Sequence, residues 1–224
     1  MDKNEMLELV YKNNLDYAAE YDSVDMLKKI INSMSIIDRK FFVENKDVYI
    51  DEALSIGNEQ TISQPTTVAR MLLLSKLKPK LDVLEIGSGS GWNASLISYL
   101  VNPGKVLSTE RIKKLHDKAE YNFNSIVNKE KLRLNAEFLY KDIFSDKIDG
   151  KFDRIISTAG ANKEIGYRLR NFGFDILKDN GLLLYPTRGF LGQGALELWK
   201  KEDVMKRILR DEGYVFVPLM KGMR

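Results

Sequence analysis

The sequence predicts an α/β fold in which a mostly parallel sheet is doubly wound, with helices on both faces. Residues 82–91 form a short apolar run, typical of a buried strand, and then a turn with glycine at every second position. An apolar stretch of helical length, 92–101, follows, and 105–110 has the pattern of a second strand that ends at Glu110. Strand-like and helix-like segments alternate through most of the remaining chain, which indicates a parallel sheet covered by helices.

Residues 1–64 are predicted to form a helical addition that packs on the main domain. Apolar residues recur at helical spacing within 4–43, and Ser23 is a candidate N-cap for the second half of this segment. The stretch 44–64 is polar and irregular. Pro65 then fits the first turn of a helix that leads into the first strand.

The main domain, 65–224, is predicted to contain alternating elements and then an antiparallel edge. In order, we expect a strand at 82–86, a helix at 92–101, a strand at 105–110, a helix at 112–127, strands at 136–140 and 154–158, a helix at 163–177 and a strand at 181–186. Two further apolar runs, 195–200 and 214–218, have only a short apolar stretch between them, at 204–209. This spacing leaves no room for a long crossover helix, so the last strands are expected to be antiparallel.

Composition excludes several classes of function. The 224 residues carry 35 basic and 32 acidic side chains, a net charge of only +3, and there is no basic tract to favour nucleic acid or an anionic membrane. The absence of cysteine excludes disulfides and thiolate catalysis, and with a single histidine it argues against a metal site. The first residues lack the pattern of a signal peptide, and no stretch has the roughly 20 apolar residues of a membrane span. We expect a cytoplasmic protein.

The glycine turn and the acidic strand end predict a nucleoside site. Glu110 stands where its carboxylate can accept hydrogen bonds from both vicinal hydroxyls of a ribose. A dinucleotide fingerprint requires G-x-G-x-x-G, but here the third glycine comes one position early, at Gly91. Glu85, a carboxylate in an apolar strand end, requires a polar partner. S-adenosyl-L-methionine, which has an ammonium group and no phosphate, fits this site. A nicotinamide or flavin cofactor, or a turn that only joins strand to helix, stays open.

Several motifs, in order, resemble one family. The spacing Glu-x-Gly-x-Gly-x-Gly resembles the first motif of class I methyltransferases. Residues 57–65, Gly-Asn-Glu-Gln-Thr-Ile-Ser-Gln-Pro, resemble the G-x-x-x-T-I-S-x-P signature of protein-L-isoaspartate O-methyltransferases. Further segments similar to that family are 47–57, 152–161, 177–186 and 216–219. The resemblance runs from about residue 36 to 220 and implies a class I methyltransferase fold, Rossmann-like, with a seven-stranded sheet and with a lid for substrate and cofactor within 1–64.

The resemblance also implies roles for individual residues. Ser63 would be the catalytic hydroxyl beside the methyl-accepting carboxylate, although Ser63 or Thr61 could equally be an N-cap before Pro65. Asp142 would accept from the adenine amino group, with Ile143 against the ring, and Thr158 would border the substrate entrance. The full set expected to bind the cofactor is Gln60, Thr61, Ile62, Glu85, Gly87, Ser88, Gly89, Gly91, Glu110, Arg111, Asp142, Ile143 and Thr158.

The reaction implied by the family suits this composition. A carboxylate is ionised at neutral pH, so methyl transfer to its oxygen requires positioning rather than a general base. The resemblance implies a monomer that esterifies the free α-carboxylate of L-isoaspartyl residues in damaged proteins, with no nucleic acid or membrane as partner. The chain departs from the family's usual residues at Asn58, Ile143 and Val215. These departures leave open a catalytically inactive module that holds the cofactor and recognises isoaspartyl chains. A second alternative, a class I methyltransferase for a small molecule or RNA, stays open because it would share the same cofactor half.

Overall fold

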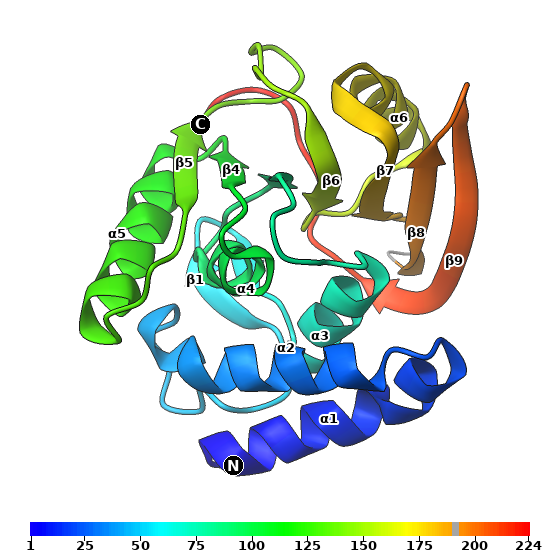
Figure 1. Ribbon diagram of the computed structural model, residues 1–224. Coiled ribbons are helices and arrows are strands. Elements are labelled where there is room, and N and C mark those ends of the chain that lie inside the picture. The colour runs from blue at the N-terminus through cyan, green and yellow to red at the C-terminus, as the bar shows by residue number, and fades with distance from the viewer. Residues whose placement is uncertain (190–192) are drawn as a thin grey trace.

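A seven-stranded sheet forms the centre of the protein (Figure 1). The computed structural model describes residues 1–189 and 193–224. The strands of this sheet are β3 (Val83–Ile86), β4 (Val106–Glu110), β5 (Ala136–Tyr140), β6 (Phe152–Ser157), β7 (Leu177–Pro186), β8 (Gln193–Lys201) and β9 (Met205–Val215). Their order is β5-β4-β3-β6-β7-β8-β9, with parallel pairs from β5 to β7 and antiparallel pairs at β7–β8 and β8–β9. The predicted doubly wound sheet with an antiparallel edge is confirmed.

Helices cover both faces of this sheet. The helices are α1 (Lys3–Glu20), α2 (Val24–Ile36), α3 (Pro65–Leu74), α4 (Trp92–Val101), α5 (Lys113–Lys129) and α6 (Lys163–Ile176). One continuous apolar cluster joins Met6 and Leu27 in the first two helices to Val83 and Leu184 in the sheet, so the N-terminal helices share the main core. On the opposite face, a second apolar cluster joins Leu169 of α6 to residues of β3, β6 and β7. None of the helices that the structure describes combines the length and apolarity needed to cross a bilayer.

The strand order creates a crevice next to β3. The chain builds outward from β3 through β4 to β5, and then returns to form β6 on the other side of β3. Ligands of open α/β sheets bind at such a reversal, beyond the carboxyl ends of the strands. The glycine turn after β3 and Glu110 at the end of β4 both lie at this edge.

The structure differs most from the predicted elements at three places. Residues 44–64 contain a small hairpin, β1 (Leu54–Gly57) and β2 (Gln60–Ile62), whose strands are too short to show a period. The fifth strand of the parallel set, β7, begins at Leu177 rather than 181. The last strand is β9, which includes the apolar stretch 204–209 in part, while the run 214–218 mostly follows it. As an edge strand, β9 is exposed over much of its length, so its sequence carries little apolar alternation.

Candidate cofactor and acceptor site

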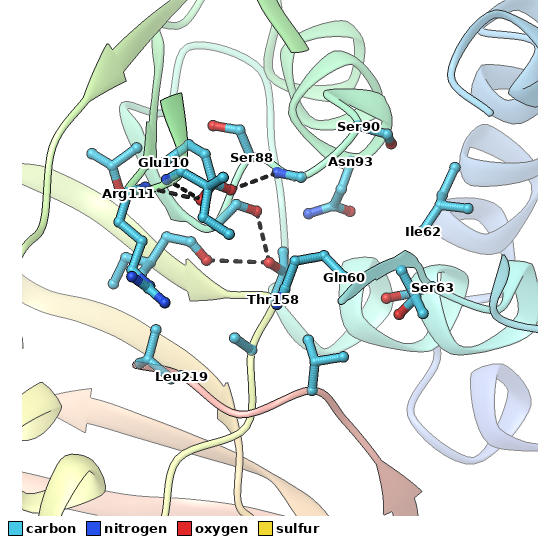
Figure 2. Close-up of a pocket in the computed structure, with 18 of the residues that line it drawn as sticks. Gln60, Ile62, Ser63, Ser88, Ser90, Asn93, Glu110, Arg111, Thr158 and Leu219 are labelled. Carbon is cyan, nitrogen blue, oxygen red and sulfur yellow. Dashed lines mark hydrogen bonds between the residues drawn. The ribbon is translucent and has the colours of Figure 1, made fainter. Parts of the chain in front are cut away.

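A cleft of about 990 Å³ lies at the carboxyl ends of β3, β4 and β6. Figure 2 shows Glu110 at one end of it and Ser63 at the other, with Thr158 and Gln60 between them. Most of the predicted site residues line the cleft: Gln60, Thr61, Ile62, Ser63, Gly87, Ser88, Gly89, Glu110, Arg111, Asp142, Ile143 and Thr158. Glu85 and Gly91 are not on its surface.

The glycine turn brings the end of β3 against the loop after β6. Gly87 has φ +93°, and a Cβ there would lie 2.6 Å from Thr158 Oγ1. The Thr158 hydroxyl donates to the carbonyl of Gly87 at 2.7 Å, so this close approach is part of the cleft wall. Gly91, with φ +86°, instead makes room for α5, because a Cβ there would lie 2.7 Å from the carbonyl oxygen of Ala119. The third glycine therefore serves helix packing.

Glu110 is held in place by backbone N–H groups. Its Oε2 accepts from Gly89 N at 3.0 Å, and its Oε1 accepts from the N–H groups of Arg111 (2.9 Å) and Ile112 (3.0 Å). The side chain is 7% exposed and lines the cleft. A carboxylate has about four acceptor positions, so these bonds leave Oε2 with room for a further donor.

Glu85 lies directly behind the cleft wall and is fully buried. Asn93, which lines the cleft, donates to its Oε1 at 2.8 Å, and the hydroxyl of Ser108 donates to its Oε2. The Ser108 hydroxyl is in turn hydrogen bonded to that of Ser88, at 2.6 Å. Burial raises the pKa of Glu85 to about 7, against the lowering effect of these hydrogen bonds. The polar partners that the sequence required are therefore present, and they connect Glu85 to the cleft.

Asp142 is covered by the end of the chain. Its Oδ1 accepts from the backbone N–H two residues further on (2.9 Å), and its Oδ2 accepts from Gly222 N (2.5 Å). We call residues 219–224 the C-terminal strap. Arg224 N donates to the carbonyl of Arg111 at 2.8 Å, which ties the strap to the segment after β4. No sequence pattern predicted this strap, because it has neither helical nor strand periodicity.

Ser63 lies where the cleft meets a second cavity, which we call the acceptor cavity. This cavity has a volume of about 980 Å³ and shares Thr61, Ser63, Thr158 and Val217 with the cleft. The hydroxyl of Ser63 forms no hydrogen bond with any residue that the structure describes. It is therefore available to a molecule that enters from either side.

The alternative role of Ser63 or Thr61 as a helix cap was wrong. Gln64 is the N-cap residue of α3, and it makes no side-chain capping bond. Asp51 instead satisfies this helix end, since its Oδ1 accepts from Thr66 N at 2.8 Å. The Ser63 hydroxyl is therefore not needed for the formation of α3. At Ser23, too, the hydroxyl does not cap the helix: it donates to the carbonyl of Ala18.

Arg39 is a structural residue of the site that sequence analysis missed. It is fully buried, and its Nη1 donates to the carbonyls of Val48 (2.8 Å) and Ile50 (2.9 Å). Its Nη2 donates to the carbonyls of Glu52 (2.9 Å) and Ser63 (3.2 Å). Burial lowers the pKa of Arg39 to about 10, so the side chain remains cationic at neutral pH. In the sequence Arg39 stands between two other charged residues, Asp38 and Lys40, so no pattern distinguishes it as the buried one.

Known proteins share the sequence and the fold of this chain. The sequence profile of the protein-L-isoaspartate(D-aspartate) O-methyltransferase family matches residues 12–224. A protein-L-isoaspartate O-methyltransferase of Pyrococcus horikoshii is 39% identical over 213 residues, covering 88% of this chain and 91% of the relative. One from Thermosipho melanesiensis is 36% identical over 208 residues, covering 86% and 94%.

A solved structure agrees with these relatives. A crystal structure described as a protein-L-isoaspartate O-methyltransferase from Plasmodium falciparum, in complex with S-adenosyl-L-homocysteine, superimposes with a TM-score of 0.79 at 25% identity. The superposition covers 99% of this chain and all of the other. The family profile, the two relatives and this structure agree with the cleft geometry, and the chain belongs to the protein-L-isoaspartate(D-aspartate) O-methyltransferase family.

Proposed function

We propose that this protein transfers a methyl group from S-adenosyl-L-methionine to the free α-carboxylate of L-isoaspartyl residues in damaged proteins, which starts their return to the normal aspartyl linkage. Family membership supports the activity. The observation that carries the proposal is the junction of two cavities at Ser63 and Thr158, since it allows cofactor and polypeptide to enter separately and meet.

The residues of the cleft fit S-adenosyl-L-methionine. The cleft joins the glycine turn after β3 to two buried acceptors, Glu110 and Asp142, at the carboxyl ends of the parallel strands. We propose that Glu110 accepts a hydrogen bond from the ribose at Oε2, the position that its backbone partners leave open, rather than one bond at each oxygen. Asp142 and Ile143 would hold the adenine, and the hairpin residues Gln60 and Thr61 would cover the methionine end. When bound, S-adenosyl-L-methionine supplies an electrophilic methyl group on a sulfonium sulfur, which is released as a thioether.

The acceptor needs orientation more than activation. An ionised carboxylate already carries the electron pair that forms the new C–O bond, so no proton has to be moved. We propose that the Ser63 hydroxyl donates a hydrogen bond to the acceptor carboxylate, while the backbone of the substrate lies along 214–217, one wall of the acceptor cavity. Holding reactants at near-attack distance supplies roughly 7–11 kcal/mol of the barrier, more than general acid–base catalysis would add.

The proposal includes a monomer that works in the cytoplasm without nucleic acid or membrane. The balanced charge of the chain, with 35 basic and 32 acidic residues and no basic tract, supports the last part, the absence of nucleic acid and of an anionic membrane as partners.

The test is methyl transfer from labelled S-adenosyl-L-methionine to two peptides that differ only in isoaspartyl or aspartyl linkage. The two isomers place the free carboxylate at different distances from the backbone, and a site with fixed polar groups can discriminate by about 10⁴-fold or more. We expect the isoaspartyl peptide to be methylated and its twin essentially not. Equal rates, or transfer to RNA and to neither peptide, would overturn the proposal. Cofactor binding without turnover on either peptide would indicate the inactive recognition module.

A further inference from the structure

A third cavity, outside the cofactor cleft, lies between α6 and the strands β7, β8 and β9. It is about 1380 Å³ in volume, and its lining joins the first turn of α6 to the outer two strands of the sheet. We call it the basic groove. It adjoins the acceptor cavity at Gly213, which lines both. Arg188 in its wall packs beside Gly160, whose added Cβ would lie 3.4 Å from the Cβ of Arg188.

The groove concentrates positive charge. Five cationic side chains line it, against two carboxylates, Glu197 and Glu212. The cationic residues are Lys163, Arg170, Arg188, Arg207 and Arg210. Because the whole chain has a net charge of only +3, this excess is a local feature and not a reflection of overall composition.

Glu197 organises two of these arginines. Its Oε1 accepts from Nη1 of Arg207 (2.8 Å) and of Arg210 (2.5 Å), and its Oε2 accepts from Trp199 Nε1 and the Tyr185 hydroxyl. Although burial acts to raise it, these hydrogen bonds lower the pKa of Glu197, so the carboxylate stays ionised. Glu212 also accepts from Nε of Arg210, at 2.5 Å, so two carboxylates hold two guanidinium groups that are still 47% and 39% exposed. Such fixed, partly exposed guanidinium groups can bind a further carboxylate at little entropic cost.

Arg170 adds a cation without a carboxylate partner in the described part of the chain. Its guanidinium stacks 4.5 Å from the ring of Trp199, and its Nη1 donates to the Tyr185 hydroxyl at 2.7 Å. Lys163 begins α6, so the positive end of that helix dipole also faces this region. The lining of the acceptor cavity, by contrast, includes Asp51 and Glu52. The acceptor cavity therefore has acidic residues in its lining, whereas the adjoining basic groove has an excess of cationic residues and favours anions.

We propose that the basic groove binds acidic side chains that flank the isoaspartyl residue, so that acidic segments of damaged proteins are the preferred substrates. The inference rests on the proposed function, because it uses the same acceptor cavity. An extended polypeptide in that cavity would pass Gly213 into the groove, since both cavities share this residue. The adjoining acceptor cavity is lined by Asp51 and Glu52, which disfavours a long polyanion such as nucleic acid across both cavities.

The test compares isoaspartyl peptides of one length whose flanking residues are glutamate, alanine or lysine. Glutamates are placed two to six residues away, on the amino side in one peptide and on the carboxyl side in another. For at least one glutamate peptide we expect a kcat/KM about 3- to 10-fold above that of the alanine peptide, mainly through KM, because exposed ion pairs contribute little each. The lysine peptides should fall below alanine, and 0.5 M salt should remove the difference.

Two variants test whether the preference for glutamate peptides arises in the basic groove. In the double variant Lys163→Gln/Arg188→Gln, which removes two exposed cations, the glutamate-to-alanine ratio should fall toward one. The control is Lys206→Gln, an exposed lysine on β9 that does not line the groove, and it should keep the wild-type ratio.

The outcomes separate this inference from the proposed function. If no isoaspartyl peptide is methylated, the proposed function fails and the inference fails with it. If all are methylated at equal rates, or if the double variant keeps the preference, only the groove assignment is overturned. Stronger inhibition by a single-stranded oligonucleotide than by a polyglutamate of equal charge would assign the groove to nucleic acid instead.

Discussion

The pKa of Glu85 makes the stability of this protein depend on pH in a defined direction. In the unfolded chain the carboxyl has its ordinary pKa of 4.5, and in the folded protein burial raises the pKa to about 7. Between these values the folded state holds a proton that the unfolded state has lost, so stability falls as pH rises. At about 1.4 kcal/mol per pKa unit, the loss reaches about 3 kcal/mol near pH 7 and then stops, because both states are ionised above it.

Glu85→Gln removes this titration and preserves the shape of the side chain. The amide oxygen can accept from Asn93 as the carboxylate does, and the amide nitrogen can donate to Ser108. The difference in unfolding free energy, wild type minus variant, should therefore decrease by about 3 kcal/mol between pH 4.5 and pH 7.5. Urea titrations at half-unit intervals, followed by circular dichroism, measure it.

The control is Glu120→Gln, which removes an exposed carboxylate from α5. Its unfolding free energy should run parallel to that of wild type over the same pH range. If the unfolding free energy of Glu85→Gln also changes with pH in parallel with that of wild type, Glu85 is ionised in the folded protein at pH 5. The reasoning from burial is then refuted.

Three further predictions concern the site. Glu110→Ala should weaken binding of S-adenosyl-L-homocysteine by roughly 1.5–3 kcal/mol, as measured by calorimetry, and an analogue that lacks both ribose hydroxyls should then bind wild type and variant alike. Ser63→Ala should lower the rate at saturating cofactor by about 3- to 10-fold with an unchanged Tm, since the hydroxyl caps no helix; an unchanged rate would remove its role. Deleting 220–224 should speed cofactor release in stopped-flow measurements, because Asp142 loses its contact with the strap; an unaltered release rate would contradict this.

The parts of the fold that the sequence predicted depend on neighbours in sequence. The strand at 82–86, its glycine turn and Glu110 lie within thirty residues of one another, and each has a local pattern that sequence analysis can detect. Arg39 and the C-terminal strap were missed because their roles exist only through distant contacts. Arg39 donates hydrogen bonds to carbonyls up to 24 residues away, and the N–H of Gly222 donates to the side chain of Asp142, 80 residues away. Such contacts leave no periodic signal.

The glycine turn was predicted from the sequence only in part, because Gly87 lines the cleft as expected and Gly91 does not. Gly87 and Gly91 have the same signature in sequence, and both adopt positive φ. Only the structure separates them, because the close neighbour of Gly87 is Thr158 in the cleft, whereas that of Gly91 is Ala119 in α5. Spacing predicted a turn, and the structure has one, but the neighbour that requires glycine at each position is set by tertiary packing.

The C-terminal strap has a practical consequence for how this protein is handled. The two ends of the chain lie on different sides of the molecule, with the N-terminus beside α1 and the C-terminus near β5 (Figure 1). Because Arg224 is bonded to the rim of the cofactor cleft, any polypeptide fused after it would start at the mouth of that cleft. An affinity tag or surface attachment placed before Met1 would instead leave from the outer helices and keep cofactor exchange unobstructed.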